Sequence, residues 1–259
     1  QGDTLTEDLD LSYRAQLKKW DFKYLEDVET PAELPVAISA ARSQQFRWNK
    51  GAAENFQKLY GRLLKDPSVS FKTKFHSFFH LLNSSMFLLV LLVAILSVPI
   101  LYIKNNNPAY SWYFNVIAAF AVSTVIFFGC YWVTYKRIHG GGIKNFFKYI
   151  GMFFTFFSVA MGFSVHNSLA VLEGHFGKKS EFIRTPKFNV SKLGEQWSGN
   201  IYLKKNLSSG MLLESILFLY FGFAIYSAFK VNDFGLILFH IMLFAGFGFV
   251  AFKSIFSRI

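Results

Sequence analysis

Three residues whose side chains could together hold a sugar and a diphosphate occur in one short run of the chain. Gln44, Arg47 and Trp48 are spaced at i, i+3 and i+4, so a helix would place all three on one face. An indole ring packs against the apolar face of a sugar ring, and a guanidinium binds phosphate oxygens by planar two-point contact. The run therefore predicts a site for these two groups, although an Arg-Trp pair also anchors helices at a membrane interface.

A second group of polar residues, near the start of the chain, could supply a general base. Thr6 is a suitable N-cap for a helix from Glu7 to about Lys19, which places Asp8 in the first turn. The helix dipole favours the carboxylate form there. A carboxylate aimed into a cleft can accept the proton of an attacking hydroxyl. Alternatively, Glu7, Asp8 and Asp10 are first-turn acids that only stabilise the helix.

The order and spacing of these groups resemble a known family. The segment from Asp3 to Ala15, the run from Pro31 to Pro35 and the segment from Gln44 to Gly51 are similar to the second half of a family 2 glycosyltransferase domain. This domain occurs in membrane-embedded polysaccharide synthases such as bacterial cellulose synthases, hyaluronan synthases and plant glucomannan synthases. The resemblance is strong over residues 1–60 and looser over the remaining sequence.

The resemblance implies a role for each of these residues. Asp8 would be the catalytic base, which deprotonates the acceptor hydroxyl. Trp48 would stack on the terminal sugar at the mouth of a membrane channel, and Arg47 would offset charge on the departing nucleoside diphosphate. For these two groups, the resemblance implies acceptor binding by Thr6, Glu7 and Trp48 and diphosphate binding by Gln44 and Arg47.

A third motif lies in a basic segment closer to the C-terminus. The run from Phe182 to Lys187 resembles the gating loop F-x-V-T-x-K of cellulose synthases, with Arg184 in place of the usual valine. In that family the loop closes over bound nucleotide. Thr185 and Lys187 would therefore clamp a phosphate, because a hydroxyl and an ammonium lie two residues apart on a mobile loop. Alternatively, the segment is a solvated basic loop that faces anionic lipid.

The composition indicates a membrane protein. The chain has 259 residues, 53% of them hydrophobic and 19% aromatic, with a formal net charge of +11. The basic residues lie between apolar runs and not in one stripe with stacking aromatics, which argues against a nucleic-acid binder. Cys130 is the single cysteine, so neither an intrachain disulfide nor a cysteine-pair metal site can form. The apolar stretches long enough to cross a bilayer are residues 78–103, 112–135, 146–172, 211–229 and 234–252.

The charges of the connecting loops predict how these stretches are arranged. Loops 136–148 and 173–210 are both basic, and the positive-inside rule places both in the cytoplasm. The stretch 146–172 between them then cannot cross once, so we expect an interfacial or re-entrant helix, interrupted near His166. This gives four spans, with five spans as the alternative. We expect a multi-pass protein of the bacterial inner (plasma) membrane, with its catalytic face in the cytoplasm.

The elements that must position the first two motifs can also be predicted. Alternation over residues 22–28 predicts a short strand. Pro31 and Pro35 precede a predicted helix from Val36 to Phe46 and beyond. A second, basic amphipathic helix is predicted after Gly51, which suits the membrane surface.

The predicted fold class is a mixed membrane protein. Residues 1–70 would be the C-terminal part of a cytoplasmic GT-A type α/β glycosyltransferase domain with interfacial helices. Residues 71–259 would be an α-helical transmembrane bundle of four spans, with the gating-type loop at 173–210. We expect the chain to be the C-terminal half of a longer enzyme and to be inactive alone, with the ligands for Mg²⁺ or Mn²⁺ in the N-terminal half.

The function implied by the resemblance is transfer of a nucleotide-activated hexose, from UDP-glucose or a related donor, onto a growing β-linked polysaccharide. The polymer would then pass across the membrane, with accessory export subunits as candidate partners. Two alternatives remain open at this point. One is a non-processive enzyme of the same family that glycosylates a lipid. The other is a non-catalytic channel or transporter, which would have no use for Asp8 and Trp48.

Overall fold

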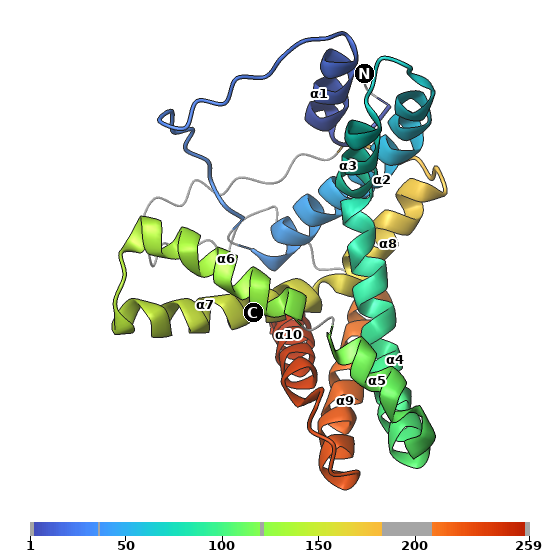
Figure 1. Ribbon diagram of the computed structural model, residues 1–259, viewed down its shortest axis with the longest axis vertical. Coiled ribbons are helices and arrows are strands. Elements are labelled where there is room, and N and C mark those ends of the chain that lie inside the picture. The colour runs from blue at the N-terminus through green and yellow to red at the C-terminus, as the bar shows by residue number, and fades with distance from the viewer. Residues whose placement is uncertain (1–2, 36, 120–121, 183–208, 257–259) are drawn as a thin grey trace. The chain divides into compact units, whose positions relative to one another are not determined.

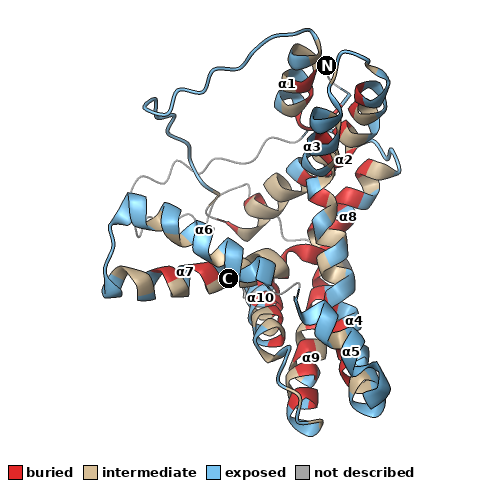
Figure 2. Ribbon diagram, in the orientation of Figure 1, coloured by how far each residue is buried: buried red, intermediate tan, exposed pale blue. Residues whose placement is uncertain are grey.

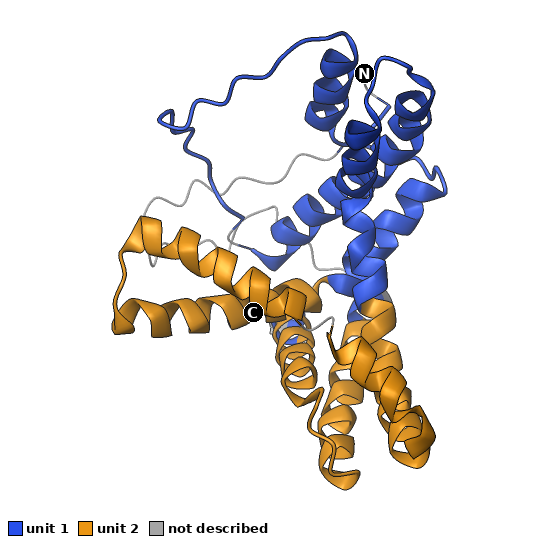
Figure 3. Ribbon diagram, viewed as in Figure 1, with its two compact units in different colours: residues 1–90, 164–211, 252–259 blue, residues 91–163, 212–251 orange. Residues whose placement is uncertain are grey.

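The computed structural model describes residues 3–35, 37–119, 122–182 and 209–256, and all regular secondary structure in these ranges is helical (Figure 1). The chain divides into two compact units, residues 1–90, 164–211 and 252–259 and residues 91–163 and 212–251 (Figure 3). The elements are α1 (Glu7–Leu17), α2 (Ile38–Lys65), α3 (Phe71–Leu82), the 3-10 helix η1 (Asn83–Ser85), α4 (Met86–Asn106), the 3-10 helix η2 (Pro108–Tyr110), α5 (Ser111–Ala118), α6 (Val122–His139), α7 (Ile143–Gly162), α8 (Ser164–His175), α9 (Ser209–Lys230) and α10 (Ile237–Phe256).

The strand predicted over residues 22–28 is wrong. This segment has no regular structure, and the side chains of Phe22, Tyr24 and Leu25 are exposed. Alternation alone does not make a strand, because its backbone groups need a neighbouring strand to pair with. The ranges described here contain no such neighbour. The α/β part of the predicted fold class is therefore not seen in them, whereas the helical part is.

Helix α1 begins at Glu7, as predicted, and ends at Leu17, two residues before the predicted end at Lys19. Lys19 has a φ of +67°, a left-handed conformation that stops the helix. Thr6 precedes the first turn, but its side chain makes no capping hydrogen bond. Thr6 therefore occupies the predicted N-cap position, but its hydroxyl accepts a hydrogen bond from Asn55 and does not cap the helix.

Helix α2 has 28 residues and runs without a break through Gly51, where the sequence predicted two helices. A glycine inside a helix costs about 0.5–1 kcal/mol relative to alanine. Here the glycine lets another segment approach closely, since a Cβ on Gly51 would lie 2.6 Å from Thr6 Oγ1. The helix begins at Ile38, two residues after the predicted start at Val36.

In the unit that contains α2, helices α1, α3 and α8 all pack against it. Buried residues, red in Figure 2, line α8 and parts of α2. Gly174 of α8 brings the two helices close, because a Cβ there would lie 2.6 Å from the Lys50 carbonyl oxygen. The apolar core between α1, α2 and α3 contains Tyr13, Leu59, Leu63 and Leu81. Burial of each such side chain contributes roughly 1.5–3 kcal/mol.

The second unit is held together by polar contacts between apolar helices. Such contacts join helices effectively where lipid offers no hydrogen-bonding partner. The pairs are Ser97 Oγ with His240 Nε2 at 2.9 Å, the Tyr102 hydroxyl donating to Ser227 Oγ at 2.9 Å, and Lys104 Nζ with Asp233 Oδ2 at 2.6 Å. They connect α4 to α10, to α9 and to the segment between α9 and α10, respectively. In the same unit α6 and α7 form a hairpin, in which the Tyr149 hydroxyl donates to the Phe128 carbonyl oxygen.

Four helical segments among the described residues are long and apolar enough to cross a membrane: Phe71–Asn106, Pro108–His139, Gly210–Lys230 and Ile237–Ile255. Helices α7 and α8 add a fifth only if the pair, which is bent by 51°, forms one span. The break between them falls at Phe163, close to the predicted interruption near His166. No residue of α6 is buried, and most of its large apolar residues are exposed, which suits contact with lipid (Figure 2). Phe128 and Trp132 are half-buried and pack against Tyr149 of α7.

Candidate active site

The three residues Gln44, Arg47 and Trp48 lie on one helix, α2, so their predicted arrangement on a common face is confirmed. Gln44 and Arg47 are half-buried, and Trp48 leaves 48% of its surface exposed. The same stripe continues along the helix through Gly51 and Asn55, which follow at helical spacing. The stripe therefore has two different ends. At one end the exposed indole of Trp48 lies beside the guanidinium of Arg47, and at the other end Gly51 and Asn55 are buried.

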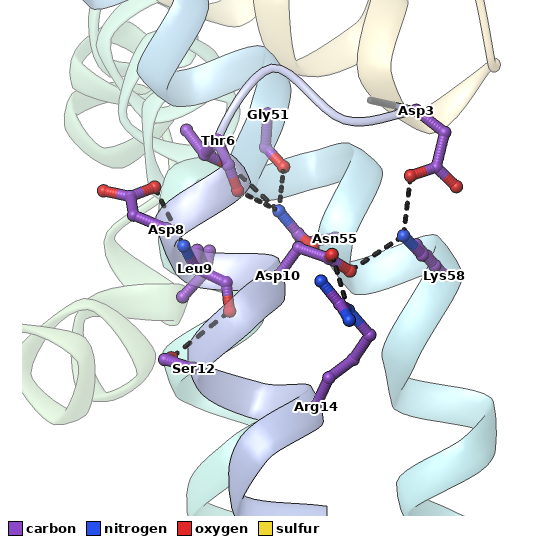
Figure 4. Close-up of polar contacts among 10 residues, drawn as sticks. All are labelled: Asp3, Thr6, Asp8, Leu9, Asp10, Ser12, Arg14, Gly51, Asn55 and Lys58. Carbon is purple, nitrogen blue, oxygen red and sulfur yellow. Dashed lines mark hydrogen bonds and ion pairs between the residues drawn. The ribbon is translucent and has the colours of Figure 1, made fainter. Parts of the chain in front are cut away.

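Thr6 lies on the packed end of this stripe (Figure 4). The Asn55 side-chain amide donates hydrogen bonds to the Thr6 carbonyl oxygen at 3.1 Å, to Thr6 Oγ1 at 2.9 Å and to the Gly51 carbonyl oxygen at 3.0 Å. Asn55 is fully buried, and Thr6 is 8% exposed. These contacts fix the chain immediately before α1 against α2.

The two motifs are thereby brought together. Gly51 follows Trp48 by three residues and Arg47 by four, which corresponds to about 4.5–6 Å along the helix axis. Because Thr6 is in contact with Gly51, the residue before α1 lies about one helical turn along α2 from the backbone of Arg47 and Trp48. Glu7 and Asp8 are both exposed. One oxygen of the Asp8 carboxylate accepts a hydrogen bond from the Leu9 backbone N–H at 2.8 Å.

Asp10, a first-turn acid in the sequence, has a different environment from Asp8. It is fully buried, and its carboxylate pairs with Lys58 at 2.8 Å and with Arg14 at 2.8 Å, while Lys58 also contacts Asp3 at 2.7 Å. Burial raises the pKa of Asp10, but the Lys58 and Arg14 contacts outweigh it and leave that pKa below its ordinary value. Figure 4 shows Asp8 outside this network. Of the two acids, only Asp8 is open to a substrate.

Glu54 is a further carboxyl group beside Thr6 that the sequence did not single out. Its Oε2 accepts a hydrogen bond from the Leu5 backbone N–H at 2.8 Å. Burial raises the pKa of Glu54, although the Leu5 hydrogen bond and the charge of Lys50 act in the opposite direction. Its position one turn beyond Lys50 on α2 was visible in the sequence, but no pattern indicated that the N-terminal segment would cover it.

Arg47 contacts the first residue of the predicted gating motif. Its guanidinium carbon lies 4.8 Å from the centre of the Phe182 ring, a cation–π distance. The Arg47 Nε is buried and has no hydrogen-bond partner among the residues that the structure describes. The remaining motif residues, Thr185 and Lys187, lie outside the described ranges.

Lys50, two residues after Trp48, is a charged residue that the sequence did not mark as unusual. It is fully buried, and its ammonium contacts Glu173 Oε2 at 3.0 Å and Ser180 Oγ at 2.5 Å. A partner 123 residues away in the sequence cannot be recognised from local spacing. The contact links α2 to the end of α8 and to the residues that follow it.

A divalent cation has no evident site in the parts of the chain described here. Within them, no group of three or more His, Cys, Asp or Glu side chains is arranged to hold a metal ion. Helix α2 instead offers an exposed indole and a half-buried guanidinium, and the first turn of α1, which begins beside Gly51, offers an exposed carboxylate. Such a set can bind a sugar hydroxyl, a sugar ring and a phosphate.

Comparison with known proteins identifies the class. Residues 1–134 match the family described as glycosyl transferase family group 2, so the chain belongs to this family. Its curated relatives include probable glucomannan 4-beta-mannosyltransferase 2 of Oryza sativa subsp. japonica, 37% identical over 100 residues that make up 38% of this chain and 17% of the relative. Glucomannan 4-beta-mannosyltransferase 7 of Arabidopsis thaliana is 40% identical over 73 residues, 28% of this chain and 13% of the relative.

A longer match covers more of the membrane region. Probable glucomannan 4-beta-mannosyltransferase 6 of Oryza sativa subsp. japonica is 28% identical over 198 residues, 73% of this chain and 31% of that protein. The chain thus spans less than a third of the length of each of these relatives. No solved structure matches it significantly. The resemblance to cellulose synthase-like family 2 glycosyltransferases is therefore confirmed, and the chain is similar to their C-terminal half.

Proposed function

We propose that this chain carries the acceptor side of a membrane-embedded glycosyltransferase that adds hexose units from a nucleotide sugar to a growing β-linked polysaccharide. The observation that supports the proposal is the packing of Thr6 on Gly51 and Asn55, because it holds the residue before the first turn of α1 against the helix that carries Arg47 and Trp48. The names of the relatives favour mannose as a transferred sugar, beside the glucose expected from the sequence.

In the proposed reaction, an acceptor hydroxyl oxygen forms a bond to the anomeric carbon of the donor, and its proton passes to the Asp8 carboxylate. The bond from the anomeric carbon to the phosphate oxygen breaks, and its electron pair leaves with the nucleoside diphosphate. Arg47 and Gln44 would stabilise that charge, assisted by Thr185 and Lys187. Trp48 would hold the terminal sugar, with Thr6 and Glu7 positioning the acceptor. Mg²⁺ or Mn²⁺ stays part of the proposal, to neutralise the diphosphate.

We also propose four membrane spans with the catalytic face in the cytoplasm. Support comes from His175 at the end of α8, whose Nε2 lies 2.8 Å from Ser85 Oγ, immediately before α4. If α4 crosses the membrane and α5 with α6 crosses back, α7 starts on the side where α4 starts. Because α8 ends on that same side, α7 and α8 together cannot make a single crossing. This favours a re-entrant or interfacial α7–α8 pair. Passage of the polymer across the membrane stays part of the proposal.

The test uses the full-length gene product in its native membrane, because the chain spans only part of its relatives. Uridine and guanosine diphosphate sugars of glucose and mannose are supplied, and the products are sized. We expect a polymer from the unmodified enzyme and a rate lower by about 10²–10⁴-fold for Asp8→Asn, the usual effect of losing a general base. Asp27→Asn, in the exposed segment after α1, is the matched control and should leave the rate unchanged.

Three results would contradict the proposal in different ways. A single-sugar lipid product would replace the polymer synthase by the lipid-glycosylating alternative. Full transfer by Asp8→Asn would remove Asp8 from the chemistry. No transfer from any of the four donors, in a protein that moves a solute, would favour the channel or transporter.

A further inference from the structure

Lys50 differs from the other charged residues of α2 because it is the one that is fully buried in the described structure. Its side chain has no exposed surface, and its ammonium contacts one carboxylate oxygen of Glu173 and the hydroxyl of Ser180. Burial of an ammonium is strongly unfavourable unless it is paired and hydrogen-bonded. Glu173 supplies the ion pair and Ser180 the hydrogen bond, so both conditions are met. These contacts fix the positions of Glu173 and Ser180, and of the segments that carry them, relative to α2.

Those segments are the last turn of α8 and the residues just beyond it. Glu173 lies near the C-terminus of α8, where the helix dipole disfavours a negative charge. Two ammonium groups compensate for this, since Lys178 contacts the other Glu173 oxygen at 2.5 Å. Gly174 allows α8 to touch the α2 backbone at Lys50. The position of the chain after α8 is therefore set by α2.

The segment after α8 continues to Phe182, whose ring contacts the Arg47 guanidinium. Ser180, held by Lys50, is two residues before Phe182, whose ring lies 4.8 Å from the Arg47 guanidinium carbon. Lys50 is itself three residues after Arg47 on α2, so the same helix holds both ends of the contact. The Arg47 Nε, buried and without a partner in the described part of the chain, depends on its surroundings for its orientation.

We propose that Lys50 is a positioning residue for Arg47: by holding Glu173 and Ser180 it fixes the Phe182 ring, and the ring fixes the guanidinium that receives the diphosphate. This inference deepens the proposed function and rests on it. Lys50 touches neither donor nor acceptor. Its effect is on the affinity for the nucleoside diphosphate and not on proton removal by Asp8.

The experiment compares Lys50→Met, Ser180→Ala and Lys58→Met in the full-length enzyme. Lys58 is a matched control, because it is a second largely buried lysine of α2 whose partners, Asp3 and Asp10, lie on the side of α1. Hydrogen exchange of residues 176–182 and direct binding of UDP and GDP are measured for each variant. We expect Lys50→Met to raise exchange in 176–182 by about tenfold or more and to weaken nucleoside diphosphate binding about tenfold, while Lys58→Met leaves both unchanged.

A further variant separates positioning from a merely structural role. Replacement of a buried ion pair by apolar residues often restores stability. Lys50→Met with Glu173→Met should therefore unfold at a temperature close to that of the unmodified enzyme but still bind the nucleoside diphosphate weakly. If Lys50→Met does not fold, Ser180→Ala decides the matter, because it keeps the ion pair and removes only the contact to the segment before Phe182.

The outcomes distinguish this inference from the proposed function. Unchanged exchange in 176–182, or raised exchange with unchanged nucleoside diphosphate affinity, overturns the role of Lys50 while sugar transfer by the unmodified enzyme still supports the function. If Lys50→Met with Glu173→Met binds the nucleoside diphosphate with full affinity, the Lys50–Glu173 ion pair has only a structural role. This result also overturns the positioning role of Lys50. An unmodified enzyme that binds neither nucleotide overturns the proposed function and this inference together.

Discussion

The close contact between Gly51 and Thr6 leads to a prediction that can be worked out from distances. A Cβ at position 51 would lie 2.6 Å from Thr6 Oγ1, 2.7 Å from the Thr6 backbone nitrogen and 2.8 Å from Thr6 Cγ2. Because one of these atoms is backbone, rotation of the Thr6 side chain cannot relieve the overlap. For ordinary contact at 3.4 Å, the chain before α1 must move away from α2 by about 0.8 Å.

That displacement carries Asp8 with it, since Asp8 is only two residues beyond Thr6. A misplacement of about 1 Å can cost about 10²-fold in rate, so we expect Gly51→Ala to lower kcat by roughly 10- to 100-fold. The donor KM should change little, because Gly51→Ala leaves Arg47 and Lys50 in place. Overpacking should cost about 1–3 kcal/mol of stability, partly offset by up to about 1 kcal/mol from the better helix propensity of alanine.

Gly61, on the same helix, provides the matched control. A Cβ there would meet no atom within 4 Å, so Gly61→Ala should stabilise the protein by about 0.5–1 kcal/mol and leave kcat unchanged. Sugar transfer is measured under initial-rate conditions, and thermal unfolding is followed in the same preparations. A Gly51→Ala enzyme with unchanged kcat, or an equal loss in Gly61→Ala, would refute the reasoning that Thr6 positions Asp8 through Gly51.

Three further predictions concern other parts of the structure. The pKa of Asp10 is lowered, so its ion pairs stabilise the protein fully above its ordinary pKa, about 4, and this effect is lost as pH falls through the lowered pKa. Lys58→Met should therefore flatten the dependence of Tm on pH below about pH 5, and an unchanged dependence would contradict this. In a Cys130→Ser background, a cysteine at 106 should be labelled from outside and one at 179 from the cytoplasm, and the reverse at either site would reject the four-span arrangement. Trp48→Ala should raise the acceptor KM by about 5- to 10-fold, whereas an unaltered acceptor KM would exclude stacking on the indole.

Part of the site could be predicted because it depends on local spacing. Gln44, Arg47 and Trp48 share a face in any α-helix, and the first turn of α1 starts where the residues after Thr6 indicate. The five apolar stretches were predicted by length alone and correspond to described helices. These features need no knowledge of what the helices contact.

The remaining features depend on partners distant in the sequence. Gly51 predicted a helix break because a glycine weakens a helix, but its lack of a side chain is used for the contact with Thr6. Asp10 was interpreted only as a first-turn acid and Lys50 was not singled out, and each is buried by contacts that local periodicity cannot reveal. The prediction of a strand at 22–28 was wrong because a strand also depends on a distant partner. It requires a neighbouring strand, which the described residues do not supply.

The central claim is that Asp8 and Trp48 serve one acceptor site on neighbouring turns of α1 and α2. The most direct test is an experimental structure of the full-length enzyme with a nucleoside diphosphate and an acceptor oligosaccharide bound. The account predicts that the terminal sugar stacks on Trp48 and that one of its hydroxyls lies about 2.6–3.2 Å from the Asp8 carboxylate. A terminal sugar that contacts Trp48 with Asp8 out of reach, or that binds away from both, would contradict it.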